Sequence, residues 1–219
     1  MRSPRRLDGV TALAGVQRAS LSAAFCSKLR TTLEEGEAAV NQLIRTYDAD
    51  VADHHQAVSR IALRIAEGLG LAPDVARGIG LASSIHDIGT IGVTATDGAG
   101  LHTRPGSTST DHPRAGASIV DGIRFPWPIA VMILQHHECV DGSGYPDGVA
   151  GRSIILGARV IAVADVVADG SDRVLSPDGP LAVLDSGRGS RFDAEVVDIC
   201  LDLFPRVPLS ARRTASTGP

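Results

Sequence analysis

The stretch that most constrains the fold covers residues 154–168 and reads IILGARVIAVADVVA. Its length and composition favour a helix that is buried on most of its sides. Asp165 lies near the end of this run, with apolar neighbours on nearly every side. A buried carboxylate without a partner costs several kcal/mol, so it needs a cation or strong hydrogen-bond donors. The chain must therefore fold so that such partners reach Asp165.

Lysine ammonium groups cannot be the usual partners of buried carboxylates in this chain, because Lys28 is the only lysine among the 219 residues. Histidines, in contrast, recur on the apolar stripes of several expected helices. Helical periodicity predicts an all-α fold with helices at about 53–69, 74–87, 112–123, 127–138, 154–169 and 193–204. An N-terminal helical region at 10–47 is expected to break at Gly36, and residues 93–110 are expected to form a mobile loop.

The helical period assigns each histidine to a face. His54 lies four residues before Val58 and so extends the buried stripe, whereas His55 should point about 100° away from it. His86 continues the apolar stripe of its helix, and Asp87 follows directly. The same reasoning applies to the later helices, and it predicts one interior surface that receives His54, His86, Asp87, His112, His136, His137 and Asp165.

Five imidazoles and two carboxylates without thiolates suit first-row metals such as Fe, Mn, Co or Zn. Seven ligands exceed the four of a tetrahedral zinc site, so two metals bridged by a carboxylate are the economical interpretation. Such metal pairs, about 3.5–4 Å apart, carry out in-line phosphoryl displacement. The three cysteines are Cys26, Cys139 and Cys200. They are far apart and odd in number, which disfavours a disulfide framework or a thiolate zinc site and fits the cytoplasm.

The motifs resemble those of the HD-GYP subgroup of the HD phosphohydrolase superfamily. After His54, the matching segments are IHDIGTIGV at 85–93, DHPRAGASIV at 111–120, HHECVDGSGYPDGVAG at 136–151 and ARVIAVADVV at 158–167. The resemblance covers residues 50–204 and implies an HD-domain helical bundle around a di- or trinuclear metal site. Residues 1–49 would form an N-terminal helical segment, and 205–219 a disordered tail.

The resemblance also implies roles for individual residues. The seven predicted side chains would be the metal ligands, with Asp87 bridging and the His86–Asp87 pair at the catalytic centre. Asp50 stands where some members have a glutamate that supports a third metal, so the sequence leaves two or three metals open. Thr90 replaces the family's lysine, which is expected to meet substrate phosphate. Further residues considered for substrate are Arg114, Arg173 and Tyr145, and Glu138 is expected to orient an imidazole.

Members of this family open cyclic di-GMP to pGpG or GMP. The resemblance therefore implies a phosphodiesterase with Fe or Mn, in which a hydroxide between the metals attacks phosphorus. Two alternatives stay open: a signalling module of weak or no activity, and another HD-superfamily phosphohydrolase. A diguanylate cyclase is the expected protein partner, through the Gly144–Tyr145–Pro146 loop, and the N-terminal helices could pair two copies of the chain. The net charge of −4 argues against nucleic acid, and no apolar run is long enough to span a membrane.

Overall fold

A computed structural model describes residues 28, 31–32, 35–92, 110–170 and 179–204. The chain divides into two compact units, Met1–Leu43 and Ile44–Pro219. In the first unit, residues 35–43 are helical through Gly36, so the predicted break there is wrong. One glycine costs a helix only about 1 kcal/mol relative to alanine, which does not end it. The expectations for the loop at 93–109, for Arg173 and for the tail at 205–219 lie outside the described residues.

The described residues of the second unit form helices and no strand, which confirms the all-α prediction. Its elements are α2 (Ala49–Gly68), α3 (Pro73–Ser83), α4 (Gly89–Gly92), α5 (His112–Val120), α6 (Ile129–Gln135), the 3-10 helix η1 (Gly151–Ser153), α7 (Leu156–Asp169), α8 (Pro180–Ser186) and α9 (Ala194–Leu203). The part of the chain that is described contains no β-strand, and its only bridge joins Arg188 and Phe192. The short helix α8 was not expected from the sequence.

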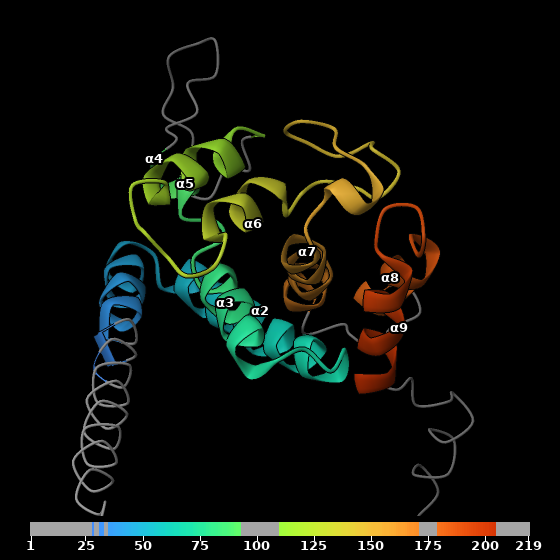
Figure 1. The fold of residues 1–219 in the computed structure, drawn as a ribbon, viewed down its shortest axis with the longest axis horizontal. Coiled ribbons are helices and arrows are strands. Elements are labelled where there is room, and N and C mark those ends of the chain that lie inside the picture. The colour runs from blue at the N-terminus through green and yellow to red at the C-terminus, as the bar shows by residue number, and fades with distance from the viewer. Residues whose placement is uncertain (1–27, 29–30, 33–34, 93–109, 171–178, 205–219) are drawn as a thin grey trace, which may run out of the picture. The chain divides into compact units, whose positions relative to one another are not determined.

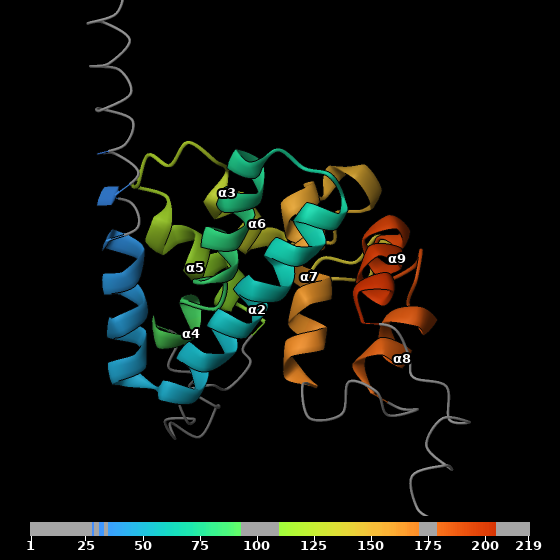
Figure 2. The ribbon, with the colours of Figure 1, turned by 90° about the horizontal axis from the view of Figure 1, so that it is seen from below.

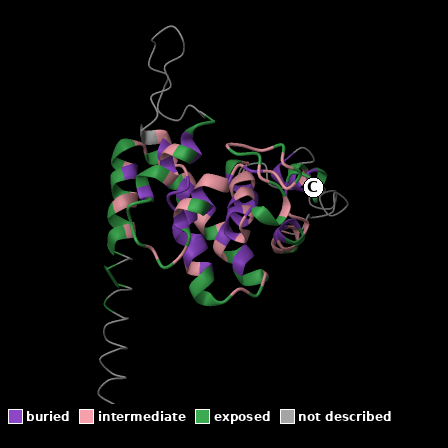
Figure 3. Cartoon of the chain, turned by 45° about the horizontal axis from the view of Figure 1, so that its top comes forward, coloured by how far each residue is buried: buried purple, intermediate pink, exposed green. Residues whose placement is uncertain are grey.

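Helix α7, the apolar run that carries Asp165, lies at the middle of this unit. Figure 1 shows it nearly end-on, with α2, α3 and α6 on one side and α8 and α9 on the other. Figure 2 shows α2 running beside it. Aromatic residues make up only 3% of the chain, so small aliphatic side chains such as Ala158, Val160 and Ala164 fill the fully buried positions of α7. In Figure 3 the buried residues gather along these central helices.

Aspartates begin two of the helices that pack against α7. Asp48 precedes α2, and its side chain accepts hydrogen bonds from the backbone N–H groups of Asp50 and Val51. Asp193 precedes α9, where it accepts from two backbone N–H groups of the first turn. Arg159 of α7 also donates to the Asp193 carboxylate. Asp193 therefore caps one helix and connects it to its neighbour.

The double role of Asp193 predicts that Asp193→Ala lowers the free energy of unfolding by about 2 kcal/mol, because the variant loses both a helix cap and a partly buried ion pair. Urea denaturation of the metal-free protein measures this. Asp198→Ala is the matched control, because the Asp198–Arg188 pair is about half exposed and its loss should lower the free energy of unfolding much less. Equal losses in the two variants would contradict the assignment.

No helix in the described segments is both long enough and apolar enough to cross a membrane.

Candidate metal centre

The site begins at the turn that follows α3. The sequence predicted a helix to residue 87, but α3 ends at Ser83 and residues 84–88 form turns. His86 is fully buried in this turn, and its Nδ1 lies 2.9 Å from the carbonyl oxygen of Ser83. Both the backbone N–H and the hydroxyl of Thr90 donate to the carbonyl oxygen of Asp87. These bonds fix the backbone at His86 and Asp87.

The two carboxylate oxygens of Asp87 face different imidazoles. Its Oδ1 lies 3.0 Å from Nε2 of His112 and 3.3 Å from Nε2 of His136. Its Oδ2 lies 3.5 Å from Nε2 of His86. A carboxylate in this position can share its oxygens between two cations. This geometry is the one expected of a bridging ligand.

All seven side chains predicted to share an interior surface come together around Asp87. On one side, α2 and α7 supply His54 and Asp165, which meet His86: the Asp165 Oδ1 lies 3.0 Å from His54 Nε2 and 3.5 Å from His86 Nε2. We call the set His54, His86, Asp87 and Asp165 the α2–α7 group. On the other side, the ligand atoms of Asp87, His112, His136 and His137 all lie within 4.8 Å of one another, and we call them the α5–α6 group.

A close approach of backbone holds the two groups together. A Cβ atom on Gly89 would lie 2.1 Å from the carbonyl oxygen of His112 and 2.5 Å from the backbone nitrogen of Gly116. Only glycine therefore lets the turn after Asp87 pack this tightly on α5. That contact brings His112 within reach of the Asp87 carboxylate.

The chemistry of these donors fits divalent metals. His86 Nε2 and Asp87 Oδ1 are buried and make no well-aligned hydrogen bond, and the Nε2 atoms of His112 and His136 face each other at 3.3 Å. Lone-pair atoms that converge in this way need a cation between them. The metal-free protein can use protons instead. Burial lowers the pKa of His86, but Asp87 and Asp165 outweigh it and raise that pKa to about 9.

The pKa values of the two carboxylates, Asp87 and Asp165, shift downward, in the opposite direction to that of His86. Burial raises the pKa of Asp87, but His86 and the bonds to His112 and His136 outweigh it, so the pKa lies well below its ordinary value. His54 and His86 likewise outweigh burial and lower the pKa of Asp165. Both acids are therefore charged at neutral pH and attract cations. A metal that binds here must displace the proton that His86 carries.

Metal binding at pH 7 should therefore release at least about one proton from the protein. Calorimetric titration of metal-free protein with Mn(II), in buffers of different ionisation enthalpy, measures the number released. The apparent affinity should rise as pH increases from 6 towards 9, because His86 loses its proton over this range. His86→Gln should release fewer protons. A heat of binding that is independent of the buffer would contradict the protonation state assigned to His86.

The Gly144–Tyr145–Pro146 loop covers the α5–α6 group. The ring of Tyr145 stacks on His137, with centroids 4.8 Å apart and planes at 26°. Burial, and then the neighbouring His136, lower the pKa of His137 to about 3. Burial raises the pKa of Tyr145 to about 12. At neutral pH His137 thus keeps a free lone pair, and the phenol keeps its proton.

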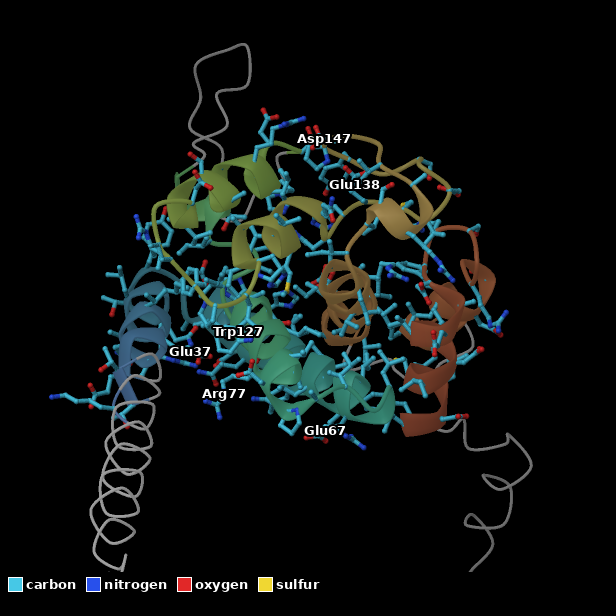
Figure 4. The ribbon with its side chains drawn as sticks, viewed as in Figure 1. Glu37, Glu67, Arg77, Trp127, Glu138 and Asp147 are labelled. Carbon is cyan, nitrogen blue, oxygen red and sulfur yellow. The ribbon has the colours of Figure 1, made fainter. Side chains whose placement is uncertain are left out.

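Glu138 and Arg114 hold this loop from two directions. The Glu138 Oε1 accepts hydrogen bonds from the backbone N–H groups of Asp147 and Gly148, at 2.7 and 3.1 Å. Its Oε2 is buried without a partner, so the prediction that Glu138 orients an imidazole is wrong. Figure 4 shows Glu138 and Asp147 close together above α6. Arg114 of α5 donates to the carbonyl of Pro146 and to the Asp147 carboxylate. A role for Arg114 towards substrate stays a prediction.

Two predicted residues are not members of either group. Asp50 is exposed in the first turn of α2, and it is absent from the sets of described residues whose ligand atoms converge. Thr90 is half-buried, and its hydroxyl is used by the backbone of Asp87 at 2.7 Å. It brings no positive charge to the site.

The residue that sequence reasoning missed is His55. It is fully buried, its ring centroid lies 4.9 Å from that of His86, and neither ring nitrogen has a partner. Helix α2 packs against both α3 and α7, so it buries two faces rather than one. A signal was present in the sequence, because the buried residues Ala52 and Ala62 lie at helical spacing from His55.

Burial and the nearby His86 lower the pKa of His55 to about 3. In the unfolded chain the same imidazole has a pKa of about 6.5, so it takes up a proton at a higher pH than in the folded protein. The metal-free protein therefore loses stability as pH falls from 6.5 towards 3. His55→Leu should remove that contribution and raise the free energy of unfolding at pH 7 by about 1 kcal/mol, since two unpaired buried nitrogens disappear. Urea denaturation at pH 7 and pH 5 tests this. The assignment is contradicted if the free energy of unfolding changes between pH 7 and pH 5 by the same amount in His55→Leu as in the unaltered chain.

Comparison with known proteins agrees with this geometry. The family model described as HD domain matches residues 38–196. The cyclic di-GMP phosphodiesterase response regulator RpfG of Xanthomonas campestris is 38% identical over 162 residues, which cover 66% of this chain and 41% of that protein. The cyclic di-GMP phosphodiesterase of Thermotoga maritima is 31% identical over 190 residues, covering 80% of this chain and 50% of that protein. The chain thus spans half or less of these two relatives.

A solved structure shows the same fold. The cyclic GMP-AMP specific phosphodiesterase V-cGAP3 of V. cholerae superposes with a TM-score of 0.56 at 17% identity, over 76% of this chain and 49% of that one. At this identity the likeness supports the fold alone. With the family match over most of its length and the HD and Gly-Tyr-Pro motifs in place, the chain belongs to the HD domain family, as an HD-GYP-like member.

Proposed function

We propose that the chain is a metal-dependent phosphodiesterase that hydrolyses cyclic di-GMP to pGpG, GMP or both. The observation that carries the proposal is the Asp87 carboxylate, whose two oxygens face two separate groups of imidazoles. RpfG and the Thermotoga maritima relative are cyclic di-GMP phosphodiesterases, which supports this substrate class. Fe(II) or Mn(II) suits a set of imidazole and carboxylate ligands without thiolate.

The α2–α7 group would hold one metal and the α5–α6 group the other. When bound, two such metals supply an acidic water and neutralise the charge that develops on the phosphoryl oxygens. The chain's own residues do the rest. Asp87 would keep the two groups at a fixed separation, and His86 would offer its Nε2 lone pair to a metal once the proton it carries has been displaced. The Tyr145 phenol, protonated beside His137, would donate a hydrogen bond to a phosphate or sugar oxygen of the substrate.

Two metals are the count proposed here. Asp50 is exposed and is absent from the sets of described residues whose ligand atoms converge, so it gives no support to a third metal of the kind held in some members. We therefore expect pGpG to be the main product. Arg173 and Arg114 remain candidates for the substrate phosphates, in place of the lysine that Thr90 replaces.

The test is anaerobic turnover of cyclic di-GMP by protein loaded with Fe(II) or Mn(II), with nucleotides separated by chromatography. We expect pGpG, and at least a 1,000-fold lower rate in Asp87→Ala, since the shared ligand is lost. Asp53→Ala is the control and should retain full activity, because Asp53 is exposed and pairs with Arg45. No product from protein with a verified metal content would overturn the proposal. Cyclic GMP-AMP, the substrate named for the V. cholerae relative, is assayed in parallel to test the alternative substrate.

A second candidate is a binding module of weak or no activity, which Thr90 favours. Thr90 removes a positive charge from a site that must hold two phosphates, and its hydroxyl is engaged by the backbone. Thr90→Lys separates the two functions. A large rise in turnover indicates a weakened enzyme, and tight nucleotide binding with no turnover in either form indicates a module.

The other assignments rest on the same resemblance. We propose that the chain acts in the cytoplasm, and that the Gly144–Tyr145–Pro146 loop is the surface on which a diguanylate cyclase would dock. Pairing of two copies through the N-terminal segment is part of the same proposal. Co-elution of the full chain with a diguanylate cyclase, lost in Tyr145→Ala, would support the docking surface.

A further inference from the structure

Three of the imidazoles around Asp87 have a distinct partner at Nδ1. For His86 and His136 it is a backbone carbonyl three residues earlier, that of Ser83 at 2.9 Å and that of Ile133 at 2.6 Å. Both histidines lie just beyond a helix end, where such carbonyls are available. His54 differs, because it lies inside α2. Its Nδ1 lies 3.4 Å from Oδ1 of Asp169, a side chain of α7.

We propose that Asp169 is a positioning residue for the metal in the α2–α7 group, acting through His54; the inference rests on the metal centre of the proposed function. Asp169 accepts the Nδ1 proton of His54. The lone pair of His54 is then on Nε2, the nitrogen that lies 3.0 Å from the ligand oxygen of Asp165. A carboxylate behind a metal-binding imidazole fixes its tautomer and makes it a stronger donor.

The placement on α7 supports this role. Asp165 and Asp169 are four residues apart, so they project from one face of the helix. The Asp165 side chain is 14% exposed and the Asp169 side chain 72%. One helix thus supplies a ligand from its buried part and, one turn later, an orienting carboxylate from its end. The His54 ring, 22% exposed, lies between the two.

The separation of 3.4 Å is longer than the usual N–H···O hydrogen bond of about 2.7–3.2 Å. A carboxylate at this distance still favours the tautomer with its proton on Nδ1, because the alternative places the Nε2 proton towards the metal and leaves Nδ1 without a donor to offer Asp169.

The experiment measures metal affinity directly and needs no turnover. Metal-free protein is titrated with Co(II), whose visible absorption reports each occupied site, in competition with a chelator. Asp169→Leu should weaken one of two metals about 10- to 100-fold and leave the other within twofold. Asp169→Asn should give a smaller loss, because the amide oxygen still accepts the proton without the charge. Asp169→Glu should recover part of the affinity.

Two controls separate positioning from other roles. Asp53→Asn removes an exposed carboxylate next to His54 that pairs with Arg45, and its metal affinity should stay within twofold of the unaltered chain. Asp165→Asn removes a ligand and should abolish one Co(II) site. Because Asp169 is mostly exposed, the stability of the metal-free protein should not change in Asp169→Leu, which urea denaturation checks.

Three outcomes would overturn the inference. Affinity within twofold in Asp169→Leu would mean that the carboxylate has no effect on His54. Loss of a whole equivalent of Co(II) would make Asp169 a ligand, completing the group that it forms with His54 and Asp165. Equal weakening of both metals together with unfolding of the metal-free protein would indicate a structural role. A chain that binds two metals with this dependence on Asp169 but does not hydrolyse cyclic di-GMP would refute the proposed function and leave the inference intact.

Discussion

The shared carboxylate of Asp87 is the interaction on which the rest of the structure depends. Its oxygens contact imidazoles on two sides, His86 on one and His112 and His136 on the other. This concentrates charge and unpaired donors in a buried space, which is unfavourable without cations. Protons relieve part of that cost in the metal-free protein, as the pKa of His86 at about 9 indicates. Metals bound here would relieve more of it and would link the folding of five segments to metal binding.

The packing around the centre serves this arrangement. The tight turn after α3 releases His86 and Asp87 from the helix, and Gly89 lets that turn approach α5 to a distance that no Cβ would allow. Helix α7 is apolar enough to lie at the middle of the unit and still presents Asp165 to the site. The Tyr145 loop is kept over the α5–α6 group by Glu138 and Arg114. Each of these contacts fixes a candidate ligand relative to its neighbours, as a site for closely spaced metals would require.

The substrate side of the site is less complete than the metal side. Thr90 supports the backbone of Asp87 and contributes no charge towards phosphate. Arg114 is engaged by Asp147 and by the Pro146 carbonyl, so it would have to exchange partners to meet a phosphate. If the proposed activity holds, a ligand set suited to metals combined with few cationic groups predicts that substrate affinity limits turnover. The same residues are compatible with the second candidate function, a binding module.

The sequence by itself determined the helical class, the positions of the main helices and the seven side chains that converge on one surface. Apolar periodicity reports which face of a helix is buried, and a buried Asp or His must then have a polar partner there. Only the tertiary structure decided which faces meet. It buried His55, because α2 packs on two sides, and it left Asp50 exposed. It also showed that Glu138 binds the backbone of the Tyr145 loop, and that Asp169 of α7 lies beside His54 of α2. These pairings depend on the distance and rotation between helices, which local periodicity does not contain.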